Sequence, residues 1–202
     1  AAQAFARARL VARELAARTR ADLLATVGTD LDLTDGSEER TRRLTSLLTP
    51  DFADIAVVVR AVDDPGALEI VAIAPGPDRS GEARRESWEG RHLPRRTPSD
   101  VHRLLVDGRP QHIEDAALTF AELISAEPDG DLPSGTFRSV IRVPLLAGNR
   151  IVAGLILAQR VSERRFDEAD VGLASEIAAR ASVSIERARL YVTSGNGSGG
   201  TQ

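Results

Sequence analysis

The side chains that could carry acid–base or metal chemistry are few in this sequence. The three histidines, His92, His102 and His112, lie ten residues apart, and the surrounding patterns place them in a loop, in a helix and at the start of a strand. A zinc site usually shows closer pairs, such as His-x3-His on one element. We therefore expect no metal site, although one histidine could still bind a haem as its axial ligand.

Nucleophilic chemistry is limited further by residues that the sequence lacks. There is no cysteine, which excludes disulfides, thiolate nucleophiles and cysteine-ligated metals. All 26 basic residues are arginine, so the chain has neither a Schiff-base lysine nor the lysine of a phosphate-binding loop. The carboxylate pairs Glu38-Glu39 and Asp63-Asp64 fall in a predicted helix start and a predicted turn, where solvated charge explains them. The sequence thus predicts a protein that is not an enzyme.

Charge and hydropathy narrow the range of partners. The formal net charge is −4 at pH 7, whereas a nucleic-acid binder usually carries a basic face. No apolar run approaches the roughly 18 residues that a membrane span needs. We therefore expect a cytoplasmic protein with neither a nucleic-acid nor a membrane partner.

The elements that must position any site are clearest in the C-terminal part of the sequence. Two apolar runs, 140–146 and 151–159, flank a turn at 147–150 and predict an antiparallel hairpin. Gly154 in the second run would allow another element to approach the sheet closely.

A long helix is predicted after this hairpin. Asp167 is placed to cap its N-terminus, and Phe166 and Val171 can close over the first turn as a hydrophobic staple. Small and apolar residues then recur at spacings of three and four up to Val192, which indicates one helix with one continuous stripe.

The remaining segments complete an α+β pattern: a central antiparallel sheet flanked by helices, with long N- and C-terminal helices packed together. We predict helices over 3–27, from a Ser37 cap to Leu48, over 97–107 and over 116–126; strands over 55–62, 67–74 and around Ile113; and a polar excursion of mixed charge over 78–98.

These features resemble the C-terminal half of a GAF domain. The similarity rests on a strand entering Val143-Pro144-Leu145, a turn with Gly148, a strand with Gly154-Leu155, and Phe166-Asp167-Glu168-x-Asp170 opening an Ala-rich helix. The helix end at 186–191 is similar to that of many GAF domains of bacterial signalling proteins, and the resemblance extends more weakly back to about Arg20. The Ala- and Arg-rich composition indicates an actinobacterial origin.

The resemblance implies three parts of the chain. We expect a connecting helix at 1–20, the GAF domain at 21–192 and a flexible Gly/Ser-rich tail at 193–202. The absence of methionine, including an initiator, leads us to expect an excised piece of a longer multidomain protein. The first part could be a solvated surface helix or a connector that pairs with its twin in a dimer, and both alternatives stay open.

The function that the resemblance implies is a non-catalytic regulatory domain. It would sense a small molecule and dimerise within a cytosolic signalling protein that contains a histidine kinase, a PPM-type phosphatase or a PAS domain. GAF domains that reduce methionine sulfoxide or attach a tetrapyrrole covalently use a cysteine, which this chain lacks. Two alternatives stay open, a dimerisation scaffold without a ligand and a haem-binding gas or redox sensor. Neither the ligand nor any cofactor is identified.

Candidate site residues follow from their positions in the implied fold. We expect a ligand pocket between one sheet face and the segment 78–126, although ordinary core and rim positions would explain the same residues. The predicted ligand-binding residues are Trp88, His102, Leu105, Phe120, Phe137 and Arg138. Stripes on the terminal helices predict a dimer interface formed by Val11, Leu15, Ala178, Ala181, Ile185 and Ala188.

Overall fold

A six-stranded antiparallel sheet lies at the centre of the molecule, with the strand order β3-β2-β1-β8-β7-β4. The computed structural model describes residues 2–62, 67–75, 88–94, 100–115, 117–124, 126, 135–160 and 165–195. The strands of this sheet are β1 (Ile55–Ala61), β2 (Ala67–Pro75), β3 (His92–Pro94), β4 (Gln111–Ile113), β7 (Ser139–Ala147) and β8 (Arg150–Gln159). A separate small ladder pairs β5 (Leu118–Thr119) with β6 (Thr136–Phe137).

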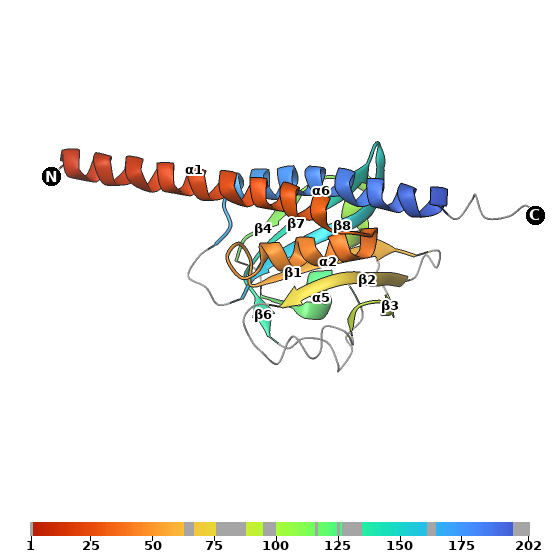
Figure 1. Cartoon of the computed structure of the whole chain (residues 1–202). Helices are drawn as coiled ribbons and strands as arrows, with labels where there is room; N and C mark the ends of the chain where they lie inside the picture. Colours follow the sequence, from red (N-terminus) through yellow and green to blue (C-terminus); the bar gives the residue numbers. More distant parts are fainter. Residues whose placement is uncertain are drawn as a thin grey trace, which may run out of the picture.

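Helices cover both faces of this sheet (Figure 1). The helices are α1 (Ala2–Leu33), α2 (Ser37–Leu48), α4 (Asp100–Asp107), α5 (Phe120–Ile124) and α6 (Glu168–Gly195). The longer helices α1, α2 and α6 pack together over one face and form the first core with it. The shorter α4, α5 and the segment 88–94 form a second core with the other face. This is the predicted α+β fold with its terminal helices packed together.

Alternation along the strands builds the two cores. On β1, Ala56 and Val58 belong to the first core, whereas Ile55, Val57 and Val59 belong to the second, as the two-residue period of a strand requires. Both predicted hairpins are confirmed, since β1 pairs with β2 and β7 pairs with β8. The turn between β7 and β8 places Gly148 at φ +61°, a conformation that glycine adopts without steric cost.

The start of α6 confirms the predicted role of Asp167. Asp167 Oδ1 accepts a hydrogen bond from the backbone N–H of Asp170 at 2.8 Å, and Asp170 Oδ2 accepts one from the N–H of Asp167 at 3.0 Å. This reciprocal pair is a capping box built from two aspartates. The guanidinium of Arg20 on α1 lies 3.4 and 3.3 Å from the two carboxylates and so joins the terminal helices. Phe166, just before the cap, packs on Phe52.

One prediction about the helices on the N-terminal side is wrong. Ser37 is not a cap, because Gly36 occupies the N-cap position at φ +79° and no side chain caps the helix. The helix α1 runs unbroken from residue 2 to residue 33, through the expected boundary between the connecting helix and the domain at residues 20 and 21. The segment has good helix formers throughout, so the helix stays continuous. The position of its apolar side chains decides only what each part of the helix contacts.

Further differences concern element boundaries. The helix α6 continues to Gly195, three residues into the predicted tail, because adding a residue to an existing helix is easy even for weak helix formers. Leu118 and Thr119 form a strand at the start of the predicted helix 116–126, and the strand β3 lies within the predicted excursion 78–98. The predicted turn at 63–66 and residues 196–202 lie outside the described residues.

Gly154 on β8 allows α4 to approach the sheet closely, as predicted. A Cβ added there would lie 2.9 Å from Leu104 Cδ2 of α4. Gly172 on α6 provides a matched contrast, because a Cβ added to it would meet no atom of another element within 4 Å.

We predict opposite effects for the same substitution at these two glycines. Gly154→Ala forces the fully buried side chain of Leu104 on α4 to shift, and we expect it to lower the free energy of unfolding by about 1–3 kcal/mol. Gly172→Ala improves helix propensity at an open position and raises it by up to about 1 kcal/mol. Urea unfolding of the three proteins measures both values, and a stabilising Gly154→Ala would contradict the close approach of α4.

Candidate functional site

Three of the predicted ligand-binding residues form an aromatic cluster in the second core. The rings of Trp88 and Phe120 are 6.4 Å apart, and those of Phe120 and Phe137 are also 6.4 Å apart. All three side chains are buried. Leu105 on α4 is partly exposed and packs against the same core. Residues far apart in the sequence are thus brought together, as predicted, while their role in binding a ligand stays a prediction.

The other two predicted residues are placed differently. Arg138 is exposed, and its backbone N–H donates to the carbonyl of Gln159. His102 lies on α4, but its side chain is outside the described part of the structure.

Arg142 is a buried cation on the same sheet face that the sequence reasoning missed. Its side chain is 1% exposed, and its guanidinium donates to the carbonyl of Leu123 at 3.0 Å and to Gln111 Oε1 at 3.3 Å. The guanidinium of Arg160 lies 5.2 Å from the centre of the Phe137 ring, within the range of a cation–π contact. The sequence signal for this site is an arginine within the apolar run 140–146. Burying a charge is costly without specific partners, so such an arginine indicates a buried polar site.

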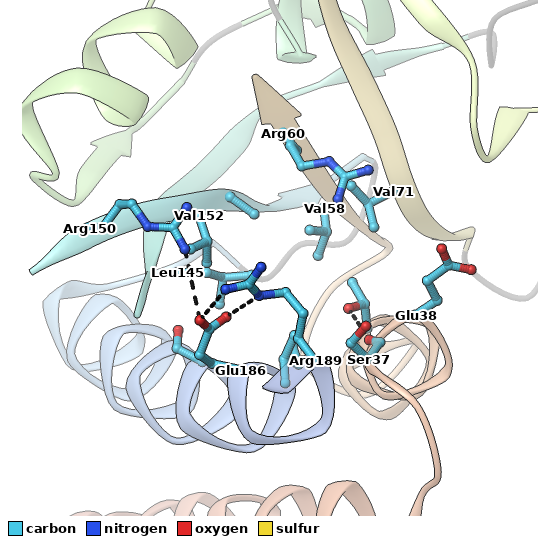
Figure 2. A pocket seen from close by; sticks show the side chains of 14 residues that line it. Ser37, Glu38, Val58, Arg60, Val71, Leu145, Arg150, Val152, Glu186 and Arg189 are labelled. Atoms are coloured by element: carbon cyan, nitrogen blue, oxygen red, sulfur yellow. Dashed lines mark hydrogen bonds and ion pairs between the residues drawn. The ribbon is translucent and has the colours of Figure 1, made fainter. Parts of the chain in front are cut away.

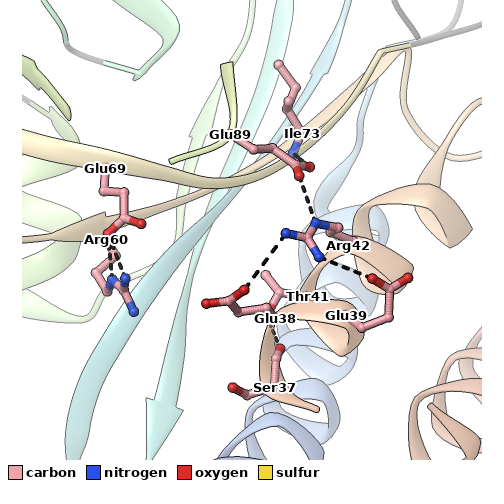
Figure 3. A network of polar contacts seen from close by, with 9 residues as sticks. All are labelled: Ser37, Glu38, Glu39, Thr41, Arg42, Arg60, Glu69, Ile73 and Glu89. Atoms are coloured by element: carbon pink, nitrogen blue, oxygen red, sulfur yellow. Dashed lines mark hydrogen bonds and ion pairs between the residues drawn. The ribbon is translucent and has the colours of Figure 1, made fainter. Parts of the chain in front are cut away.

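A polar network at the sheet edge joins the two sides of the molecule (Figure 3). Glu89 follows Trp88 directly, and its carboxylate accepts a hydrogen bond from Arg42 Nε of α2 at 2.8 Å and one from the backbone N–H of Ile73 at 3.3 Å. Glu39 also accepts from Arg42, at 3.2 Å. The hydrogen bonds to Glu89 and then Glu39 raise the pKa of Arg42. Trp88 therefore belongs to the aromatic cluster, while the next residue, Glu89, binds α2 through Arg42.

An open cleft of about 180 Å³ lies between α2, α6 and the sheet (Figure 2), and we call it the α2–α6 cleft. Glu186 and Arg189 of α6 lie at its rim, where two hydrogen bonds of 2.7 and 2.8 Å join them. These bonds lower the pKa of Glu186 and raise that of Arg189. The residues that line the cleft are Ser37, Glu38, Thr41, Val58, Arg60, Val71, Leu145, Arg150, Val152, Ala153, Ser182, Ile185, Glu186 and Arg189.

The α6 residues predicted to form a dimer interface pack against the chain's own core instead, which corrects the prediction. Ala178, Ala181 and Ala188 are at most 5% exposed, and Ile185 packs against the first core. Small side chains let α6 lie close to its own sheet, so these residues are not available on the surface. Among the side chains of α6 that the structure describes, the large apolar ones that are exposed are Val183, Leu190 and Tyr191.

The predicted interface residues on α1 are exposed. Val11 is 57% and Leu15 65% exposed, in the half of α1 that projects beyond the sheet (Figure 1). Leu15 also borders a groove of about 860 Å³ between α1 and the start of α6, whose apolar lining includes Leu23, Phe52 and Leu173.

The two histidines whose side chains are described, His92 and His112, lie on opposite edge strands of the sheet. His92 on β3 is exposed, whereas His112 on β4 is largely buried with its Nδ1 3.6 Å from Glu114 Oε1. Within the described ranges, no group of three His, Asp or Glu side chains could hold a metal ion. Over the same part of the chain, every helix is too short or too polar to span a bilayer.

Comparison with known proteins identifies the fold. The family model described as GAF domain matches residues 32–185. None of the curated proteins matches the chain.

Solved structures show the same architecture at low sequence identity. One is the GAF domain of a phosphoenolpyruvate-protein phosphotransferase from Coxiella burnetii, with a TM-score of 0.65, 14% identity, and coverage of 86% of this chain and 96% of that one. The second GAF domain of DevS from Mycobacterium smegmatis matches with a TM-score of 0.55, 18% identity and coverage of 76% and 95%. Free methionine-R-sulfoxide reductase from Neisseria meningitidis matches with a TM-score of 0.60, 17% identity and coverage of 85% and 91%.

We predict that the edge network depends on the charge of Glu89. Glu89→Gln removes a charge-assisted hydrogen bond from a carboxylate that is 10% exposed, and should lower the free energy of unfolding by about 1–3 kcal/mol. Glu38 contacts the same arginine at 3.9 Å but is 80% exposed, so Glu38→Gln should cost less than about 0.5 kcal/mol. Urea unfolding measures both, and equal effects would show that Glu89 is no more than a surface charge.

Proposed function

The chain belongs to the GAF domain family, and from this premise we propose that it is a non-catalytic regulatory domain that binds a small molecule and dimerises. GAF domains are commonly regulatory sensor domains of signalling proteins. For this chain we propose a bacterial, cytoplasmic protein with a neighbouring histidine kinase, PPM-type phosphatase or PAS domain. We consider the chemistry of the reductase from Neisseria meningitidis a poor fit, since this sequence contains no cysteine.

The aromatic cluster is the single observation that carries the binding part of the proposal. It belongs to the core on the sheet face opposite the terminal helices. Trp88 and Phe120 come from the segment 78–126 that we expect to border the pocket, and Phe137 lies beside Phe120. The Arg160 guanidinium lies 5.2 Å from the centre of the Phe137 ring, and ring faces beside a guanidinium can hold a planar or partly anionic molecule. We place the ligand between this cluster and α4, with Leu105 at its border.

The edge network offers a route from this pocket to the terminal helices. A ligand that moves Trp88 also moves Glu89, which holds Arg42 of α2. The helix α2 packs in turn on α6. A ligand can shift these helices only by its difference in affinity for two arrangements, so the proposal requires that the position of Trp88 differs between them.

Dimerisation is proposed through α1. Its projecting half carries Val11 and Leu15, and a second copy of α1 could cover them together with the groove beside α6. A helix with exposed apolar side chains at a spacing of four can form such a seam. The boundaries 1–20, 21–192 and 193–202 remain part of this proposal.

A thermal-shift screen tests ligand sensing. We expect one compound among haem, cyclic nucleotides and common metabolites to raise the melting temperature, as a ligand that binds only the folded state must. The shift should disappear in Leu105→Trp, which narrows the proposed pocket, and persist in Leu146→Trp at an exposed position of β7. A screen without any stabilising compound would favour the scaffold alternative, and a haem absorption band would favour the haem alternative.

Light-scattering mass against concentration tests the dimer. We expect the wild-type protein to approach twice the monomer mass, and Leu15→Asp to remain monomeric because a buried carboxylate would face the partner helix. Leu33→Asp, at a similarly exposed position near the other end of α1, is the control and should leave the mass unchanged. Equal masses for Leu15→Asp and wild type would remove α1 as the interface.

A further inference from the structure

We propose that the α2–α6 cleft is a second binding site, which takes a small monocarboxylate with a compact apolar body. The cleft lies on the face of the sheet that the terminal helices cover, away from the aromatic cluster. The inference therefore does not depend on the function proposed above.

The inner wall of the cleft is apolar. Val58 of β1, Leu145 of β7 and Ala153 of β8 form its deepest part, and each is at most 7% exposed. Val71 and Val152 are partly exposed at its sides. A cavity of about 150 Å³ lined by apolar residues accepts a benzene ring. A cleft of about 180 Å³ therefore has room for one six-membered ring or a short branched chain.

The rim supplies more guanidinium groups than carboxylates. Glu186 is engaged by both hydrogen bonds from Arg189, which form a bidentate pair. Arg150 at the start of β8 approaches the same carboxylate only to 3.8 Å, beyond hydrogen-bond distance, and its side chain is 65% exposed. Figure 2 shows Arg150 and Arg189 on either side of Glu186. The carboxylate of Glu186 is thus the shared partner of the Arg189 and Arg150 guanidiniums.

The other charges near the cleft are balanced in pairs. Arg60 is held by two hydrogen bonds to Glu69 of β2, at 2.6 and 3.0 Å. Glu38 lies 3.9 Å from Arg42, which Glu89 and Glu39 bind more closely, and Figure 2 shows it on the opposite side of the cleft from Arg150. Among the guanidiniums that line the cleft, Arg150 therefore has the weakest pairing, and its five N–H donors suit a second carboxylate.

This charge balance selects the class of ligand. A single negative charge completes the pairing of Arg150, whereas the second charge of a phosphate monoester would lie near Glu186. A cation would be repelled by Arg150, and a neutral molecule would gain only the apolar wall. A monocarboxylate seated here would contact α2, α6 and the sheet together and would stabilise their packing.

Benzoate is a suitable probe, with benzamide as its neutral analogue of the same shape and phenyl phosphate as the dianionic one. We expect saturable binding of benzoate in the millimolar range, the affinity of a ligand of this size, followed by amide chemical shifts in NMR titrations of the whole chain. The shifts should map to Val58, Val152 and Ala153. Benzamide and phenyl phosphate should bind at least about tenfold more weakly, the factor that a lost or opposed charge contact gives.

Two variants and one control locate the site. Arg150→Gln should weaken benzoate binding by about tenfold, and Val152→Phe should abolish it by filling the cleft. Arg187→Gln removes the same charge from an exposed position of α6 that does not line the cleft, and should change nothing. The melting temperature of each variant confirms that it is folded.

Several results would overturn the proposal. These are the absence of saturable binding, shifts that map to the aromatic cluster, equal affinity for benzoate and benzamide, tighter binding of phenyl phosphate, or an Arg150→Gln variant that binds as well as wild type.

Discussion

Both faces of the central sheet are apolar, and this constraint decides where every helix lies. Alternate side chains of β1 enter one core or the other, so leaving either face open would expose a large apolar area at a cost of roughly 25 cal/mol per Å². The long terminal helices cover one face, and the short elements between β2 and β7 cover the other. The sheet therefore separates the terminal helices, through which we propose dimerisation, from the aromatic cluster, for which we propose a ligand.

The edge of β2 is the place where these two sides meet. The strand β3 pairs only with the first residues of β2, so the remaining backbone groups of this edge need other partners. The segment 88–91 supplies them, through the backbone of Gly90 and Arg91 and through the carboxylate of Glu89. The same carboxylate also binds Arg42 of α2. Glu89 therefore both pairs the edge of β2 and connects the elements on the two sides of the sheet.

The helix α6 illustrates how one element divides its surface. Ala174, Ala178 and Ala181 belong to the core between α6 and the sheet and let the helix approach β7 closely. Glu186 and Arg189 border the α2–α6 cleft, and Leu190 and Tyr191 face solvent. The close fit means that α6 cannot move without disturbing the sheet. A change in the sheet would therefore shift α6, which agrees with the regulatory role that we propose.

The sequence by itself determined the features that depend on neighbouring residues. These are the two hairpins, the aspartate cap of α6, the close approach at Gly154 and, with them, the GAF fold. Only the tertiary structure decided which surface each stripe contacts. The alanines of α6 form a pattern that fits a partner helix as well as the chain's own sheet, and the capping of α2 at Gly36 depends on how α1 ends.

The candidate site shows the same division. Gathering Trp88, Phe120 and Phe137 was predictable from the implied fold, since each lies in a segment that must cover one sheet face. The link between Arg42 and Glu89, the buried Arg142 and the α2–α6 cleft were not. They join residues tens of positions apart, and a sequence pattern carries no distance between side chains that meet only when the sheet and its helices have packed.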